Sequence, residues 1–389
     1  MAKEALMLET ISRAAESNLL ERGFSRRQLG RIAAVLTAGA TLPFYNEAAL
    51  AQRALRSEIP SDAVRINSNE NPLGPCPEAL EAISQVAKSG GRYSPHGEEE
   101  QTVRIVAETV DLKPEYIAFF AGSGDPLFRS ALAFTSPTRP WVMGDPGYES
   151  GGSAAAFIGA KVIRVPLRKD HSHDVQAMVK AHPNPGVIYL TNPNNPTGTL
   201  TTLEDIEWTA ANMPKGSLLL VDEAYIHFSD HAKSAFGLVA SDKDVIVLRT
   251  FSKVYGMAGI RAGYASGRPD LIAKLRPWGS NSVPVTSLAA SMASLRSKTV
   301  VAERRKINRD IREDVFAYLD KKNLQFTKSE ANHFMVNVGR PGGDVVQAMA
   351  KERVLIGRLW PAWPNHVRIS IGTRDDMEKF KTAFSKVMA

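Results

Sequence analysis

A lysine follows an apolar, β-branched run closely enough to do chemistry at a strand end. Residues 245–248 read Val-Ile-Val-Leu, which predicts a buried strand, and a polar turn leads on to Lys253. Ligands of α/β sheets bind beyond the strand ends, where a desolvated amine can attack a carbonyl. Thr250, Ser252 and Arg261 add two hydroxyls and a permanent cation, which suit a phosphate monoester. Carbonyl plus phosphate indicates pyridoxal 5′-phosphate (PLP) held by Lys253 as a Schiff base, although on the lysine alone a solvated side chain is the preferred interpretation.

Two further apolar runs end in groups that suit the same cofactor. Residues 218–221 lead to Asp222, whose carboxylate would keep a pyridine nitrogen protonated so that the ring accepts electrons. Tyr225 follows three positions later, and Asn195 follows another predicted strand; both can bond the ring's phenolic oxygen. Taken singly, Asp222 also fits a helix N-cap and Asn195 a plain turn. Three such strand-end loops in succession favour the PLP site.

Five segments of the sequence form motifs that indicate the same cofactor site. They read Asn-Glu-Asn-Pro-Leu-Gly-Pro at 69–75, Asn-Pro-Asn-Asn-Pro-Thr-Gly at 192–198, Val-Asp-Glu-Ala-Tyr at 221–225, Arg-Thr-Phe-Ser-Lys-Val-Tyr-Gly-Met-Ala-Gly-Ile-Arg at 249–261 and Val-Arg-Ile-Ser-Ile-Gly-Thr at 367–373. From about residue 60 onward the chain resembles the fold-type-I PLP enzymes of aminotransferase class I/II, most closely histidinol-phosphate aminotransferases. The resemblance implies an α/β fold, with a mostly parallel central sheet in a large domain and a smaller α+β domain.

The resemblance assigns further residues to the cofactor. Ser123, between Gly122 and Gly124, would form a backbone cradle for the phosphate at a helix start. Relatives usually have Gly-Ser-Asp-Glu here, so Gly124 removes an acidic side chain and leaves the backbone cradle. Tyr148 would stack on the pyridine ring. Tyr93 would reach the cofactor phosphate of a partner subunit, so a homodimer is expected; the alternative is a packed surface tyrosine.

The resemblance also implies the reaction and its substrate contacts. Lys253 would carry the substrate's α-proton while Asp222 keeps the ring charged. Arg368 would fix the substrate carboxylate in a bidentate pair, Arg358 would offer a second anionic contact, and Asn71 lies in a segment that crosses the site mouth. The expected activity moves an amino group between an amino acid or a histidinol-phosphate-like amine and a 2-oxo acid.

Other activities share these motifs. An aromatic amino acid aminotransferase would use the same pocket, and a PLP-dependent decarboxylase of a (phospho)amino acid would release carbon dioxide. A PLP-binding regulator is disfavoured, because such regulators usually carry a DNA-binding helix-turn-helix, whereas the chain before residue 60 has the features of a signal peptide. A cofactor-free exported binding protein would lack the PLP absorbance.

Composition and charge bound the remaining possibilities. The 389 residues are 43% hydrophobic and 23% charged, ordinary for a globular protein of two domains. The net charge is +7, but the basic residues are scattered, so no nucleic-acid partner is expected. Cys76 is the single cysteine, which excludes an intrachain disulfide. His171 and His173 alternate in a loop without a third ligand, so solvent-exposed histidines are expected and no metal site.

The N-terminus has the features of a twin-arginine export signal. Arg26 and Arg27 precede an apolar run at 32–42, and an Ala-Leu-Ala site at 49–51 precedes Gln52. The run is too short for a permanent membrane anchor. This predicts a periplasmic enzyme exported after folding; if the run is instead an ordinary first helix, the enzyme is cytoplasmic.

These features predict a division into four parts. Residues 1–51 are the signal peptide and 52–95 the N-terminal arm with part of the small domain. The large PLP-binding domain spans 96–286 and the small C-terminal domain 287–389, entered by one long amphipathic helix over residues 287–319.

Overall fold

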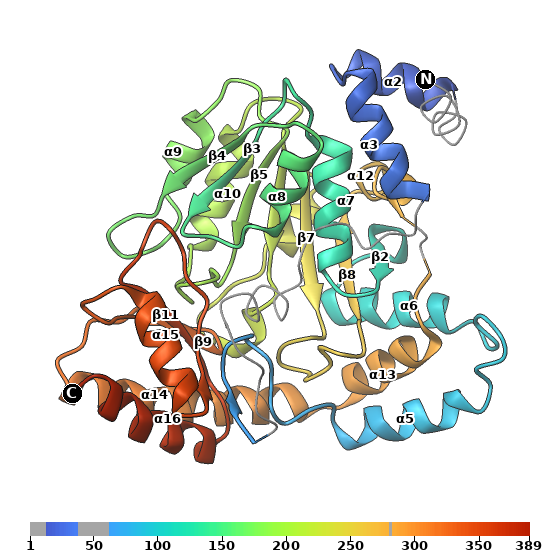
Figure 1. Cartoon of the computed structure of the whole chain (residues 1–389). Coiled ribbons are helices and arrows are strands. Elements are labelled where there is room, and N and C mark those ends of the chain that lie inside the picture. Colours follow the sequence, from blue (N-terminus) through green and yellow to red (C-terminus); the bar gives the residue numbers. More distant parts are fainter. Residues whose placement is uncertain (1–12, 38–61, 280–281) are drawn as a thin grey trace.

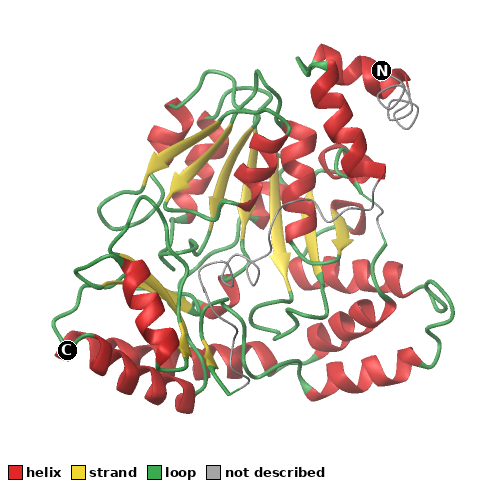
Figure 2. Ribbon diagram, in the orientation of Figure 1, coloured by secondary structure: helices red, strands yellow, loops and turns green. Residues whose placement is uncertain are grey.

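A seven-stranded sheet forms the centre of the large domain (Figures 1 and 2). The computed structural model describes residues 13–37, 62–279 and 282–389. The strand order is β2-β8-β7-β6-β5-β3-β4, and within the described chain only β8 runs against its sheet neighbours. The strands are β2 (Ile117–Phe120), β3 (Trp141–Asp145), β4 (Val162–Pro166), β5 (Val187–Thr191), β6 (Leu218–Asp222), β7 (Val245–Thr250) and β8 (Gly263–Gly267). The predicted α/β architecture with a mostly parallel sheet is confirmed.

Both faces of this sheet are covered by helices, which explains why its central strands are apolar without alternation. Tyr189 of β5 and Leu220 of β6 pack on one face, against α7 (Gly124–Phe134), α8 (Ser150–Phe157) and α12 (Pro269–Ala273). Their neighbours Ile188 and Leu219 pack on the other face, against α9 (Val175–Lys180), α10 (Leu203–Asn212) and α11 (Phe236–Ala240). Successive residues of a strand point to opposite faces, so each strand contributes to two cores.

The small domain has a core of its own. It contains α14 (Val300–Lys321), β9 (His333–Asn337), α15 (Gly342–Lys351), β10 (Val354–Leu355), β11 (His366–Ser370) and α16 (Arg374–Val387). β9 and β11 pair antiparallel, and β1 (Val64–Arg65) pairs parallel with β10. Val64 and Ile66 are buried in this core, so the chain before the large domain contributes to the small domain.

A layer of three helices lies below the sheet in Figure 1. It consists of α5 (Pro77–Ala87), α6 (Glu98–Val110) and α13 (Val285–Arg296), and α13 contacts both of the others. The prediction of one helix over residues 287–319 is wrong, because α13 ends at Arg296 and α14 begins at Val300. Ser297 has extended backbone angles that break the helical hydrogen-bond ladder.

Two N-terminal helices, α2 (Arg13–Glu21) and α3 (Arg26–Thr37), pack against the large domain. Leu19 and Leu29 are buried in one cluster with Leu132 of α7. Arg22 donates hydrogen bonds to three carbonyls at the end of α7, those of Leu132, Ala133 and Thr135, at 2.9–3.0 Å. The expected cleavage site at 49–51 and the end of the apolar run lie outside the described residues. No helix in the described ranges is long and apolar enough to cross a membrane.

Candidate active site

A cavity of about 500 Å³ opens at the carboxyl ends of β5, β6 and β7. Each of these strands ends in a loop or residue that lines it, because parallel neighbours place their carboxyl ends along one edge of the sheet. The predicted residues brought together here are Ser123, Gly124, Tyr148, Asn195, Asp222, Tyr225, Thr250, Ser252, Lys253 and Arg261. The three strand-end loops thus meet as the sequence predicts.

Lys253 lies in the turn that follows β7. Only 8% of the residue is exposed, so its ammonium is largely removed from water. Its Nζ donates to the backbone carbonyl of Asn69 at 3.0 Å and lies 5.4 Å from the centre of the Tyr225 ring. The amine therefore lies at the cavity, in a position from which it can form and leave a covalent bond.

Asp222 ends β6 and is buried at the base of the cavity. Its Oδ2 accepts from the Tyr189 hydroxyl at 3.0 Å, and its Oδ1 accepts from the Ala224 N–H at 3.1 Å. Burial raises the pKa of Asp222 to about 6, although both hydrogen bonds and the nearby Lys253 oppose that rise. Such a carboxylate gains a partner when a cationic ring nitrogen comes beside it.

Tyr225 is the centre of a polar network at the wall of the cavity. Its hydroxyl oxygen accepts from Asn69 Nδ2 at 3.1 Å and from Asn195 Nδ2 at 3.4 Å. Asn195 Oδ1 in turn accepts from Arg368 Nη1 at 3.0 Å, while Ser370 Oγ donates to Asn69 Oδ1 at 2.8 Å. The network joins large-domain loops to β11 of the small domain, so both domains fix the orientation of Tyr225.

A set of small polar groups gathers at the start of α7. Ser123 is the N-cap of this helix, whose first-turn N–H groups favour an anion. Thr250 donates to Ser252 Oγ at 3.0 Å, and Arg261 Nη1 lies 3.4 Å from the same oxygen. Gly122 has φ +93°, and a Cβ there would overlap the Arg261 guanidinium. The glycine therefore lets the arginine reach the helix start.

Comparisons with known proteins identify the family. The family model described as aminotransferase class I and II matches residues 61–384. The chain belongs to this family. Histidinol-phosphate aminotransferase of Symbiobacterium thermophilum is 32% identical over 335 residues, which are 84% of this chain and 91% of that protein. Histidinol-phosphate aminotransferase 2 of Pseudomonas fluorescens is 32% identical over 338 residues, 85% of this chain and 90% of that protein.

The solved structures agree with this assignment. Histidinol-phosphate aminotransferase from Sinorhizobium meliloti, solved in complex with pyridoxal-5′-phosphate, aligns with a TM-score of 0.79 and 26% identity, over 90% of this chain and 95% of that one. The predicted family, fold type I, PLP-dependent aminotransferase activity and cofactor are thereby confirmed. The substrates of this chain are amino acids and keto acids, as the family implies.

The residues of the cavity fit PLP. The Ser123 cradle with Thr250, Ser252 and Arg261 would hold the phosphate, and Asp222 would face the ring nitrogen. When bound, PLP supplies a carbonyl that takes up an amino group and a ring that accepts electrons. Gly122 supports the fit, since the space that a side chain would fill there is taken by the phosphate-side arginine.

The predicted substrate residues lie in three different settings. Arg368 is fully buried behind Asn195, and its Nη2 also donates to the Asn67 carbonyl at 2.7 Å. Arg358 is ion-paired with Glu149 of the large domain. Asn71 donates to the Val254 carbonyl at 3.0 Å and lines a separate, smaller cavity. The structure thus places Arg368 beside the site, Arg358 in an ion pair and Asn71 outside the main cavity.

Sequence reasoning missed several groups that the fold brings to the site. Asn69, in the same motif as Asn71, makes the contact with Tyr225, and Tyr189 supports Asp222. His333 packs edge-on against Tyr225 with ring centres 4.6 Å apart. The hydroxyl of Tyr189 was the one detectable signal, since a tyrosine in a wholly buried strand needs a polar partner.

The expectation of solvent-exposed histidines is wrong for His173. This residue is buried, and its Nε2 lies 3.3 Å from the Thr191 carbonyl. Burial lowers its pKa to about 4, so the ring is neutral at neutral pH. His171 is less buried and packs edge-on against Trp363. The position of His173 in a loop did not reveal that its side chain is buried near the end of β5.

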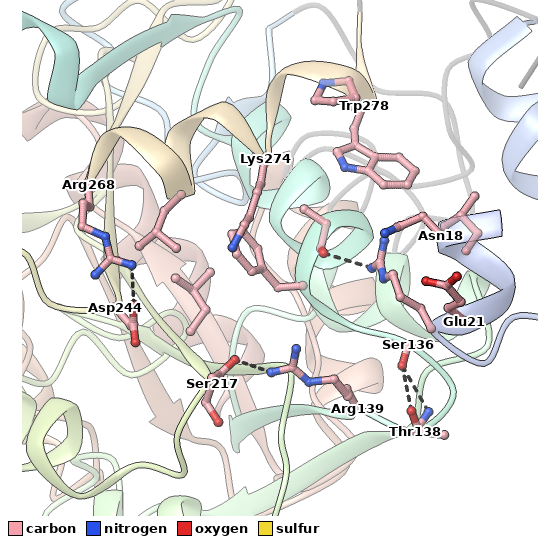
Figure 3. A pocket seen from close by; sticks show the side chains of 18 residues that line it. Asn18, Glu21, Ser136, Thr138, Arg139, Ser217, Asp244, Arg268, Lys274 and Trp278 are labelled. Carbon is pink, nitrogen blue, oxygen red and sulfur yellow. Dashed lines mark hydrogen bonds and ion pairs between the residues drawn. The ribbon is translucent and has the colours of Figure 1, made fainter. Parts of the chain in front are cut away.

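A second cavity, of about 750 Å³, lies between α2 and the large domain (Figure 3). Its cationic side chains have partners within the chain. Arg139 donates to the Gly216 carbonyl, Arg268 pairs with Asp244 at 2.9 Å, and Arg22 bonds the end of α7. These charges are used to join structural elements, so the larger cavity is not the site of the chemistry.

Proposed function

We propose that the chain transfers an amino group from an amino acid or a histidinol-phosphate-like amine to a 2-oxo acid. This proposal rests on one cavity that is lined by the buried Lys253 and the carboxylate of Asp222. The cation Arg368 donates to Asn195, which lines the same cavity. A carboxylate-bearing or phosphate-bearing donor bound to Arg368 would present its α-carbon toward Lys253.

The residues at the site have separate roles in the proposed reaction. Arg368, held by Asn195 and the Asn67 carbonyl, binds and orients the anionic group of the donor. Lys253 Nζ takes the α-proton and returns it. When PLP is bound, Asp222 would keep the ring nitrogen protonated, and Tyr225 with Asn195 would hydrogen-bond the phenolic oxygen.

The test is to mix the purified enzyme with a panel of amino donors, including histidinol phosphate, and to follow the absorbance of bound cofactor together with keto-product formation. Amino transfer gives a keto product and leaves the amino group on the cofactor. Release of carbon dioxide without a keto product would overturn the proposal in favour of the decarboxylase.

We also propose that the enzyme is a homodimer in which Tyr93 reaches the partner's cofactor phosphate. Tyr93 is 98% exposed in the single chain, and Leu73 and Leu80 are also exposed apolar side chains. Mixed dimers of Tyr93→Phe and Lys253→Ala subunits contain one site with both defects and one with neither. Activity should reappear in the mixed dimers to the extent that Tyr93→Phe alone is impaired, whereas a monomer in sedimentation would refute the idea.

Export by the twin-arginine route is the localisation we propose. Arg26 and Arg27 are exposed at the start of α3 and so accessible to a receptor, while Leu29 is buried on the large domain. The route carries folded proteins, which suits a cofactor acquired by folding. The packing of α2 and α3 equally suits the alternative, an N-terminal element of a cytoplasmic enzyme.

Cell fractionation separates these locations. Replacing Arg26 and Arg27 with Lys should leave full-length, PLP-loaded protein in the cytoplasm, while the native protein is found in the periplasm and begins near Gln52. Native protein that begins at its first residues and stays in the cytoplasm would refute export.

A further inference from the structure

Asn69 lies where the chain passes from the small domain to the active site. The segment before it is held by the small domain, because β1 pairs with β10 and the Ile66 carbonyl accepts from the Ser370 N–H at 3.0 Å. Ser68 and Glu70, its neighbours in the chain, line the active-site cavity, and Asn69 itself is fully buried between them. Asn69 is therefore placed to connect the small domain to the cavity.

The hydrogen-bonding groups of Asn69 have partners in both domains. In the small domain, the Ser370 hydroxyl accepts from the Asn69 N–H at 2.9 Å and donates to its Oδ1 at 2.8 Å. Asn332 Nδ2 also donates to the Asn69 carbonyl at 3.1 Å. On the side of the active site, the same carbonyl accepts from Lys253 Nζ at 3.0 Å, and Asn69 Nδ2 donates to the Tyr225 hydroxyl oxygen at 3.1 Å. The small-domain contacts thus hold the two groups of Asn69 that meet Lys253 and Tyr225.

The backbone of Asn69 has a conformation that depends on these contacts. Its φ is +53°, in the left-handed region, which asparagine adopts more readily than most residues other than glycine. A residue persists in this region when the surrounding structure determines its conformation. The direction of the Asn69 carbonyl, and with it the position of the Lys253 amine, therefore depends on the bonds from Ser370.

Tyr225 is the second group that Asn69 affects. Its oxygen accepts from Asn69 Nδ2 and, at 3.4 Å, from Asn195 Nδ2. Hydrogen bonds accepted by an oxygen make its own O–H a stronger donor, because the bonds in a chain polarise one another. The hydroxyl that would bond the phenolic oxygen of PLP is therefore strengthened by an amide that the small domain holds in place.

We propose that Asn69 is a positioning residue that places the Lys253 amine and strengthens the Tyr225 hydroxyl as a donor, and that Ser370 holds Asn69 from the small domain. The PLP site is complete only when β11, which carries Ser370, is packed against Asn69. These roles belong to the cofactor site and go beyond the amino transfer proposed above, since they hold for any amino donor.

Three variants separate these contacts from the rest of the site. Ser370→Ala removes a hydroxyl that bonds Asn69 twice, and Asn69→Gly removes the amide but keeps a backbone that suits the left-handed region. Ser291→Ala is the matched control, because its buried hydroxyl bonds the Ser287 carbonyl within α13, outside the lining of the active-site cavity. Each variant is compared with the wild type by PLP titration of the cofactor-free protein and by the pH midpoint of the visible absorbance change of bound PLP.

The two variants at the site should weaken PLP binding by roughly fivefold or more, since each loses buried hydrogen bonds. The pH midpoint should rise by roughly half a unit or more, because a weaker Tyr225 donor leaves more negative charge on the phenolic oxygen, which then holds the proton on the lysine-bound nitrogen more tightly. Ser370→Ala/Tyr225→Phe should show no further rise over Tyr225→Phe, because Ser370 acts through Asn69 on that hydroxyl. The Ser291→Ala control should match the wild type in both measurements.

Weaker PLP binding with an unchanged pH midpoint would show that the contacts only stabilise the fold, and would overturn the role assigned to Asn69. Unchanged PLP binding in Ser370→Ala would overturn it as well, since Lys253 bonds PLP from the position that Asn69 sets. A further rise in the double variant would show that Ser370 acts by another route. Both measurements need only bound PLP, so their outcome is separate from the donor panel that tests amino transfer.

Discussion

Each end of the central sheet carries a large cavity, and the charged side chains of the two cavities differ in their partners and in their burial. At the carboxyl end, Lys253 donates to a backbone carbonyl and Asp222 accepts from the Tyr189 hydroxyl. At the amino end, Arg268 contacts the carboxylates of Asp244 and Asp270 and is about one-third exposed. A surface arginine matched by carboxylates supports the fold, whereas Lys253 and Asp222 are buried in the cavity that fits PLP, where burial raises the pKa of Asp222.

Replacing one lysine at each end of the sheet with alanine should give the largest difference in turnover. Lys253→Ala should reduce turnover by roughly 10⁴-fold, because Lys253 is the one lysine among the described residues that line the active-site cavity. Lys274→Ala, in the amino-end cavity, is the matched control and should leave turnover near wild type. Borohydride reduction followed by peptide mapping gives a second readout, and a lysine–PLP adduct that persists in Lys253→Ala would contradict the assignment.

Asp222→Asn should lower activity and raise the stability of the cofactor-free protein. The folded-state pKa is about 6 against an ordinary value of 3.8, so the buried carboxylate destabilises the fold as pH rises between these values. The neutral amide of this variant would avoid that cost, giving a gain of roughly 2–3 kcal/mol in unfolding free energy at pH 8 that disappears near pH 4. Urea unfolding across this pH range measures the gain, and turnover should fall by roughly 10²-fold or more.

An equal gain at pH 4 and pH 8 would show that the ionisation of Asp222 is not its source. Near-wild-type turnover of Asp222→Asn with PLP bound would show that the ring nitrogen does not depend on this carboxylate.

Tyr189→Phe tests how the hydrogen bond from Tyr189 affects the pKa of Asp222. The hydroxyl donates to Asp222 Oδ2 and lowers its pKa, so its removal should raise that pKa further and weaken PLP binding by roughly tenfold. Cofactor affinity is measured against pH by fluorescence. A uniform loss at every pH would indicate a packing defect, since Tyr189 also contacts Trp141, and would contradict the electrostatic role.

Arg139→Gln, at the amino end, should have the smallest effect. The guanidinium donates to the Gly216 and Pro185 carbonyls in a half-buried position. Its loss should cost roughly 0.5–1.5 kcal/mol of unfolding free energy and leave kcat and KM unchanged. A change in kcat would show that the two cavities are coupled, and the contrast between the sheet ends would fail.

Several long-range contacts could not be predicted from local patterns. Glu149 meets Arg358 across 209 positions, and Asn69 meets Tyr225 across 156. Sequence spacing carries no distance over such separations, so Arg358 was assigned to the substrate and Asn71 was chosen over Asn69. The burial of His173 was not predicted either, because it depends on contacts with Gly144 of β3 and Thr191 of β5 that a loop pattern does not reveal.

The sequence by itself determined the fold class and the positions of Lys253, Asp222 and Asn195, because an apolar run covered on both faces must be a strand and the next polar residues must stand at its end. The tertiary structure alone decided which partners each charge receives. The pKa of Asp222, the orientation of Tyr225 and the ion pair of Arg358 with Glu149 depend on groups that only the packing of distant segments brings within a few ångströms, since electrostatic and hydrogen-bond energies fall steeply with distance.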